Sequence, residues 1–177
     1  MASFVYHKEK IVQTRADVRK IVILGVGNLL LRDEGIGIHV IRALSDESIP
    51  ANIDIEIIDG GTSSDALHSM VGVDKLIIID AVQGGGNPGA VYRFRIDDVV
   101  LEGKYSISLH QIDLFESLRM MEYLGGKPKD TVIIGVEPKE IEWGLRLSPE
   151  LEQKVSHIVE IVLKEVTEEI TEEDGIC

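Results

Sequence analysis

The chain has 177 residues, of which 44% are hydrophobic, and its formal net charge is −13 at pH 7. This length and hydrophobic content suit one folded domain with a real core, and they exclude a chain that is disordered throughout. The negative charge argues against nucleic-acid binding, because the phosphates would be repelled. The one cysteine, Cys177, excludes a disulfide framework and a thiolate metal cluster.

The location and domain organisation follow from what the chain lacks. No apolar run approaches the ~20 residues that cross a bilayer, and the first ten residues, MASFVYHKEK, lack the apolar core of a signal peptide. We therefore predict a cytoplasmic protein without membrane insertion. Because no repeat or linker interrupts it, we predict a single domain over residues 1–177. Its parts are an N-terminal arm or edge segment (1–19), a core (20–167) and an acidic, frayed tail (168–177).

The segment 21–40, IVILGVGNLLLRDEGIGIHV, predicts a strand, a glycine turn and a helix. A short apolar run that ends at glycine suits a strand buried on both faces, as in a parallel sheet, and we place it at about 20–26. Apolar residues at helical spacing predict a helix over about 34–45. Asp33 is expected to cap this helix, since carboxylates suit the positive end of the helix dipole.

Further apolar segments complete the expected sheet. Strands are predicted at about 53–59, 76–80 and 131–136, and an antiparallel edge strand at 91–94, where the polarity alternates. Helices are predicted after Ser64, after His110 and from Ser148-Pro149 onward. Strands that alternate with helices at this spacing belong to the α/β class. We expect a three-layer αβα domain with a mostly parallel twisted sheet of about five strands.

Acidic and imidazole side chains stand next to three of these elements. Asp33 and Glu34 follow the first strand, Asp80 ends the third, and His110 precedes a later helix. If the first and third strands are neighbours, with the second outside the first, their carboxyl ends form a switch point of the kind where α/β sheets bind ligands. Glu34, Asp80 and His110 would then converge and suit a borderline divalent metal ion such as nickel or zinc. The alternative is that they are ordinary helix caps.

The glycines after the first strand allow a competing interpretation. Gly25-Val26-Gly27 resembles the start of the dinucleotide-binding GxGxxG pattern, and Asp59 ends the second strand as a ribose-binding acid would. The third glycine position, however, holds Leu30, and two acids would stand near the pyrophosphate. We interpret these glycines as turn residues and keep a Rossmann-like nucleotide site as a lesser alternative.

Three other features have simpler interpretations. The stretch 59–62, DGGT, permits close approach of an extended peptide, but a tight turn capped by Thr62 is the simpler interpretation. Residues 84–89 predict a hairpin-type connection rather than a mobile flap, and Trp143 is expected to pack internally. Serine or cysteine nucleophilic catalysis is not expected, because no serine has a nucleophile-elbow context and Cys177 is on the tail.

Several motifs occur in a distinctive order and spacing from about Ile21 to the last helix. They are GVGNLLLRDEGIG at 25–37, DGGT at 59–62, IIIDAV ending its strand at Asp80, SLHQ containing His110, GVEP at 135–138 and GLRLSPE at 144–150. Together they resemble the hydrogenase maturation endopeptidases, which trim the C-terminal extension from the large subunit of nickel-iron hydrogenases. Residues 1–19 and the tail after about Thr167 are less well covered by this resemblance.

The resemblance implies that Glu34, Asp80 and His110 contact nickel. It also implies that the precursor supplies this nickel, rather than the protease holding it permanently, and that cysteines of the precursor complete the coordination. Cleavage would then follow metal insertion.

The resemblance leaves the hydrolytic step open. Nickel could polarise the carbonyl or a bound water, with one carboxylate as general base. It could instead serve for recognition only, with Asp33 or Asp59 assisting the water. Gly60, Gly61 and Thr62 become candidates to receive the extended C-terminal segment.

We therefore predict a peptide hydrolase that activates a nickel-iron hydrogenase by processing its large-subunit precursor after nickel insertion. A non-catalytic nickel- or precursor-binding maturation chaperone is the alternative from another class, and it predicts binding without cleavage. The nucleotide-binding alternative predicts thermal stabilisation by NAD or similar ligands.

Overall fold

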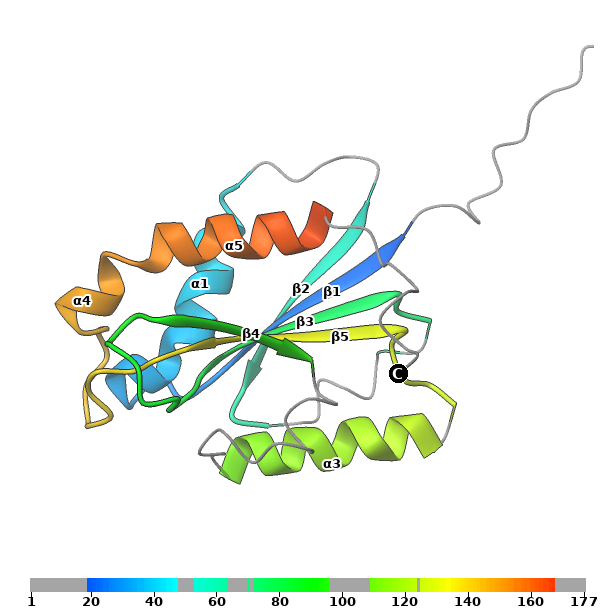
Figure 1. Cartoon of the computed structure of the whole chain (residues 1–177), viewed down its shortest axis with the longest axis horizontal. Coiled ribbons are helices and arrows are strands. Elements are labelled where there is room, and N and C mark those ends of the chain that lie inside the picture. Colours follow the sequence, from blue (N-terminus) through cyan, green and yellow to red (C-terminus); the bar gives the residue numbers. More distant parts are fainter. Residues whose placement is uncertain are drawn as a thin grey trace, which may run out of the picture.

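Figure 1 shows the computed structural model, which describes residues 19–47, 53–63, 70, 72–95, 109–123 and 125–167, with the backbone alone described for 109–115. The strands form one sheet, and the helices lie on both of its faces. In chain order the elements are β1 (Lys20–Val26), the 3-10 helix η2 (Arg32–Gly35), α1 (Ile36–Leu44), β2 (Asp54–Gly61), β3 (Lys75–Ala81), β4 (Val91–Arg95), α3 (Leu109–Tyr123), β5 (Asp130–Val136), α4 (Pro149–Glu152) and α5 (Val155–Thr167).

The sheet has the order β2-β1-β3-β5-β4. β1 pairs in parallel with both β2 and β3, and β3 pairs in parallel with β5. Among the described strands, β4 alone is antiparallel, and it lies at the edge beside β5. This order confirms the mostly parallel sheet with an antiparallel edge strand. It also confirms that the first and third strands are neighbours, with a switch point between their carboxyl ends.

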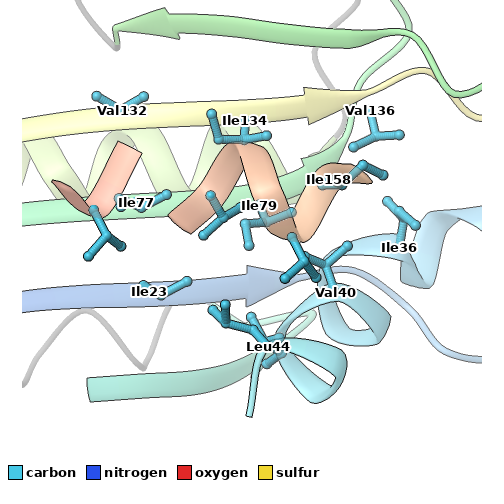
Figure 2. Close-up of a cluster of buried hydrophobic side chains, with 14 of the residues drawn as sticks. Ile23, Ile36, Val40, Leu44, Ile77, Ile79, Val132, Ile134, Val136 and Ile158 are labelled. Atoms are coloured by element: carbon cyan, nitrogen blue, oxygen red, sulfur yellow. The ribbon is translucent and has the colours of Figure 1, made fainter. Parts of the chain in front are cut away.

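The three central strands are buried on both faces, which explains their continuous apolar sequences. Alternate residues point to opposite sides. Figure 2 shows one side, where Ile23, Ile77 and Ile134 pack under α1 and α5. On the other side, Val22, Leu24 and Ile78 join a second core that includes Leu118 of α3. The outcome is the predicted αβα arrangement, with α3 opposite α1 and α5 (Figure 1).

Two helix starts differ from the prediction. The helix expected over 34–45 is preceded by η2 and begins at Ile36 after Gly35, with no side-chain cap, so the expected capping role of Asp33 was wrong. The last helix, expected to be continuous from Ser148-Pro149, divides into α4 and α5 around a turn at 153–154. Asp33 makes tertiary contacts instead of capping, as described below.

Some predictions fall outside the described residues. These are the helix expected after Ser64, the N-terminal arm up to residue 18, and the acidic tail from residue 168 onward. Within the described part, each helix is too short or too polar to cross a bilayer.

Candidate active site at the carboxyl end of the sheet

The turn after β1 is packed tightly against the ends of two strands. η2 contacts β3, and α1 begins directly above β1 and β3. A Cβ atom at Gly37 would collide with the carbonyl oxygens of Val26 and Ile79, and one at Gly27 would collide with the carbonyl oxygen of Glu34. Glycine is therefore required here so that the helix can start against the sheet.

This packing bears on the nucleotide interpretation. In a dinucleotide site, the glycines leave space for a pyrophosphate at the helix N-terminus. Here the backbone of Glu34 fills the space beside Gly27, which has a φ of +139°. The glycine motif is thus explained by close packing of protein backbone, which disfavours the Rossmann-like alternative.

Asp80 and Glu34 come to this end of the sheet from neighbouring strands. Asp80 lies near the end of β3, opposite Gly135 of β5, and only 4% of its surface is exposed. Its Oδ1 accepts a hydrogen bond of 2.8 Å from the N–H of Ala81. Its position continues the alternation of Leu76 and Ile78, which face the α3 side of the sheet. Glu34 lies in η2, and its Oε2 atom is buried.

The backbone of His110 lies in the first turn of α3. β3 and β5 begin side by side at the amino end of the sheet, where the N–H of Asp130 donates to the carbonyl of Asp74. α3 ends at Tyr123, only a few residues before β5 begins, so the last turn of the helix lies near this amino end. Because α3 and β5 each span roughly 22 Å, the first turn of α3 returns to the carboxyl end, as Figure 1 shows.

The side chain of His110 is outside the described residues. Among the side chains that the structure describes, no group of three histidine, cysteine or acidic residues is arranged to hold a metal. The set of Glu34, Asp80 and His110 therefore stays a prediction. It is supported by the approach of the three chain segments that carry these residues to one end of the sheet.

Asp33 has a role that the sequence did not reveal. Its buried carboxylate accepts hydrogen bonds from three backbone N–H groups of the loop after β5. Oδ2 accepts from Lys139 at 3.0 Å and Glu140 at 2.9 Å, and Oδ1 accepts from Ser148 at 2.7 Å. Asp33 thus joins the turn after β1 to a loop more than one hundred residues later, which favours positioning over proton transfer.

Glu137 is a second functional candidate that sequence reasoning missed. Its buried Oε2 accepts hydrogen bonds from the N–H groups of Gly84 (2.7 Å) and Gly86 (3.2 Å) and from the hydroxyl of Tyr92 (2.7 Å). The glycine-rich turn is therefore pinned beside the end of β3. It is not the expected hairpin connection, because β3 and β4 lie on opposite sides of β5. The only sequence signal was the glutamate directly after an apolar strand.

The DGGT stretch ends the edge strand β2 with a β-bulge. Asp59 pairs with Gly25 and Gly61 with Val26, so Gly60 is the extra residue. A Cβ at Gly60 would lie 2.8 Å from Leu24 Cδ1, whereas Gly61 has open space around it and a φ of +54°. Gly61 is therefore the glycine of the two that has open space where a side chain would stand.

Comparison with known proteins identifies the family. A family model described as hydrogenase maturation protease, HycI, matches residues 38–165. The chain belongs to the hydrogenase maturation protease family. Hydrogenase 2 maturation protease from Escherichia coli K12 is 36% identical to this protease over 151 residues, which cover 84% of this chain and 92% of that one.

Solved structures agree with this assignment. The hydrogenase maturating endopeptidase HybD from E. coli has a TM-score of 0.74 and 35% identity, covering 83% of this chain and 91% of that chain. The NiFe hydrogenase maturation protease HybD from Thermococcus kodakarensis has a TM-score of 0.68 and 26% identity, covering 84% and 99%. The predicted family, the α/β fold and the assignment as a peptide hydrolase are confirmed.

Proposed function

We propose that this protease works in the cytoplasm, where it removes the C-terminal extension of a nickel-iron hydrogenase large-subunit precursor after nickel insertion. We further propose that it recognises the precursor's nickel through Glu34, Asp80 and His110. Membership of the hydrogenase maturation proteases supports the substrate class. The observation that most supports the nickel contact is the approach of η2, the end of β3 and the start of α3 to one end of the sheet.

The donor set suits nickel carried by the substrate. Two carboxylates and one imidazole are acceptable ligands for a borderline divalent ion, and they leave coordination positions for cysteines of the precursor. Because Asp80 is buried, a cation placed beside it would stabilise the charged carboxylate more than it would at an exposed site. A precursor without nickel would add no compensating charge, so shared ligation discriminates loaded from empty precursor.

The hydrogen bonds of the neighbouring acids narrow the choice of general base. Both oxygens of Asp33 already accept backbone N–H groups. Asp59 accepts the N–H of Gly61 and lies 3.8 Å from the guanidinium of Arg42. For proton acceptance from the attacking water we favour Glu34 or Asp80, because a water polarised by the metal would lie beside the carboxylates that we propose to face it. Nickel in the precursor would supply polarisation of the water or of the scissile carbonyl.

The extended segment of the precursor is assigned to the end of β2. Residues 60–62 remain the candidate contact, with Gly61 as the central residue because the space around it is open. Gly61→Asn should raise the KM for precursor, since asparagine tolerates a positive φ and adds bulk. Gly72→Asn is the matched control, because Gly72 also has open space and a φ of +79° but precedes β3 at the other end of the sheet. An equal KM in both variants would contradict the peptide assignment.

The main test is intact-mass analysis of a large-subunit precursor incubated with the protease, with and without nickel loaded. We expect loss of a C-terminal peptide from the nickel-loaded form only. Glu34→Gln and His110→Ala should abolish this cleavage. Glu160→Gln, which changes an exposed acid on α5, should leave it unchanged.

Each other outcome has a definite meaning. Cleavage of both precursor forms would retain the peptidase and remove nickel as the recognition element. Tight binding without cleavage would favour the maturation chaperone. Absence of both binding and cleavage with the cell's own precursors would reject the proposed substrate.

A further inference from the structure

Large apolar side chains are exposed on two segments that meet beside η2, the turn before it and the loop after β5. Contiguous apolar surface on a protein often marks a binding site. Trp143, the chain's one tryptophan, was expected to pack internally, and its exposure shows that expectation to be wrong. We call the group the Trp143 platform; its members and exposed fractions are Leu30 (50%), Ile141 (45%), Trp143 (81%) and Leu145 (70%).

Two distant chain segments form this surface side by side. The N–H of Gly144 donates to the carbonyl of Leu30, and the N–H of Arg32 donates to the carbonyl of Gly144, both at 3.0 Å. These bonds make a parallel bridge between Leu31 and Gly144, which places Leu30 next to Trp143. In Figure 1 the loop after β5 lies beside η2 at the same end of the sheet.

The platform is held in place by charged groups. The Asp33 carboxylate binds the loop near both of its ends, at residues 139–140 and at Ser148. The Arg32 guanidinium pairs with Glu140 at 3.0 Å and Glu142 at 3.1 Å, and Arg32 adopts a φ of +48°. A surface loop fixed by this many interactions presents its apolar side chains in a preformed arrangement, which lowers the entropic cost of binding.

We propose that the Trp143 platform is the docking surface for the folded body of the hydrogenase large-subunit precursor. This inference rests on the proposed function. The platform is continuous with the proposed site, because the N–H of Glu34 donates to the carbonyl of Leu31 at 3.1 Å. A folded protein whose nickel lies at Glu34 would therefore come close to the surface around Leu30.

The side chains of the platform suit the folded body of the precursor better than its extension. An exposed tryptophan is a common anchor that fills a pocket on a folded partner, and surrounding apolar side chains exclude water from the contact. Together they supply on the order of a few hundred Å² to an interface that buries about 800 Å² per partner. The extension already has a candidate path at Gly61, on the edge strand β2. The platform thus contacts the part of the precursor that is retained.

Charge argues against two other kinds of partner. The whole chain carries −13, and this charge opposes self-association and opposes binding to anionic membranes. Glu140 and Glu142 beside the platform are already paired with Arg32, so the platform offers its partner mainly apolar side chains.

The single tryptophan provides a direct test. Protease that contains 5-fluorotryptophan carries fluorine only at Trp143. Its ¹⁹F signal should shift or broaden when nickel-loaded precursor is added, and equally when the large subunit without its extension is added. In parallel, Trp143→Ala should raise the KM for precursor at least tenfold, with kcat within twofold of wild type. Tyr123→Ala removes an aromatic residue that is 88% exposed on α3, and it should change neither the KM nor the kcat.

The outcomes separate this inference from the proposed function. Nickel-dependent cleavage with an unchanged KM in Trp143→Ala, or an unchanged ¹⁹F signal on binding, would overturn the platform and leave the proposed function intact. A ¹⁹F change that requires the extension would also overturn it. Binding that depends on Trp143 but produces no cleavage would support the platform and reject the protease proposal. Concentration-dependent self-association that Trp143→Ala removes, measured by sedimentation, would assign the surface to a second copy.

Discussion

The two ends of the central sheet hold their buried carboxylates in different ways. At the amino end, carboxylates pair with cations: Glu165 contacts Lys75 and Arg93, and Asp130 lies near Lys75 and Arg95. At the carboxyl end, Asp33 and Glu137 are held mainly by backbone N–H groups.

The difference separates charge neutralisation from positioning. A lysine or arginine beside a carboxylate removes its attraction for another cation, and the buried pair mainly fixes the structure. Backbone N–H groups orient a carboxylate without adding a full positive charge. The carboxyl end can therefore be rigid and still favour a cation brought by a substrate, whereas the amino end cannot.

The amino end should show the largest loss of stability. Lys75→Met leaves the buried carboxylate of Glu165 with Arg93 as its remaining cation, so we expect the free energy of unfolding to fall by about 3 kcal/mol. Urea denaturation measures this loss. Lys129→Met is the control, because it removes an exposed lysine that pairs with Asp74, and it should lower the free energy of unfolding far less. Equal losses would mean that burial does not distinguish these pairs.

Asp33→Asn should affect both stability and catalysis at the carboxyl end. In the asparagine, an NH₂ group replaces one of the two carboxylate oxygens and faces a backbone N–H group that it cannot accept. We therefore expect the free energy of unfolding to fall by about 2 kcal/mol. The loop after β5 should no longer be fixed relative to η2, and kcat/KM for precursor should fall more than tenfold. Glu150→Gln, which removes only the exposed ion pair with Lys139, should preserve both quantities. Full activity in Asp33→Asn would contradict the positioning role.

Replacing Glu137 should have a smaller effect. Glu137→Ala removes one acceptor shared by Gly84, Gly86 and Tyr92, and we expect a loss of about 1.5 kcal/mol because water can reach the exposed turn. Tyr92→Phe removes one of the three bonds and should cost about 1 kcal/mol or less. Chemical denaturation of the two variants tests this order, and a larger loss from Tyr92→Phe would show that Glu137 does not organise the turn.

The smallest effect concerns acid stability. The hydrogen bond from Lys129, followed by that from the Lys20 N–H, lowers the pKa of Asp74. Burial alone would raise the pKa of Glu165, but hydrogen bonds and charge from Arg93 and Lys75 outweigh it and lower that pKa.

A lowered folded-state pKa means that the unfolded chain takes up protons first as the pH falls. Both carboxylates therefore stabilise the protein above about pH 4.5, and this contribution is lost as the pH drops through their folded pKa values. Asp74→Asn should reduce the slope of unfolding free energy against pH below that point. An unchanged slope would show that Asp74 contributes nothing to acid sensitivity.

Local sequence was a good guide to the sheet. β1 was predicted with its observed bounds, and the apolar runs of β3 and β5 were located to within about one residue. Such runs are reliable because a strand buried on both faces needs apolar residues at every position. The alternating polarity of 91–94 likewise identified the edge strand β4, since only one of its faces is well buried.

Contacts between distant segments could not be read in this way. Asp33 looks like a helix cap in sequence, because an acid before a helical pattern usually is one. Its actual donors lie more than one hundred residues away, and backbone N–H groups leave no signature in side-chain identity. Glu137 and its glycine turn are hidden for the same reason.

The family, the α/β architecture and the candidate set of Glu34, Asp80 and His110 could all be inferred from the chain alone, because periodicity and motif spacing are local properties. The packing of distant segments sets which acids are held by backbone N–H groups, which are neutralised by cations, and which apolar residues remain exposed. Trp143 shows the reason most clearly. Its large apolar side chain favours burial, but burial requires another part of the protein to pack against it. Within the described fold, the loop that is bridged to Leu31 at Gly144 leaves Trp143 facing solvent.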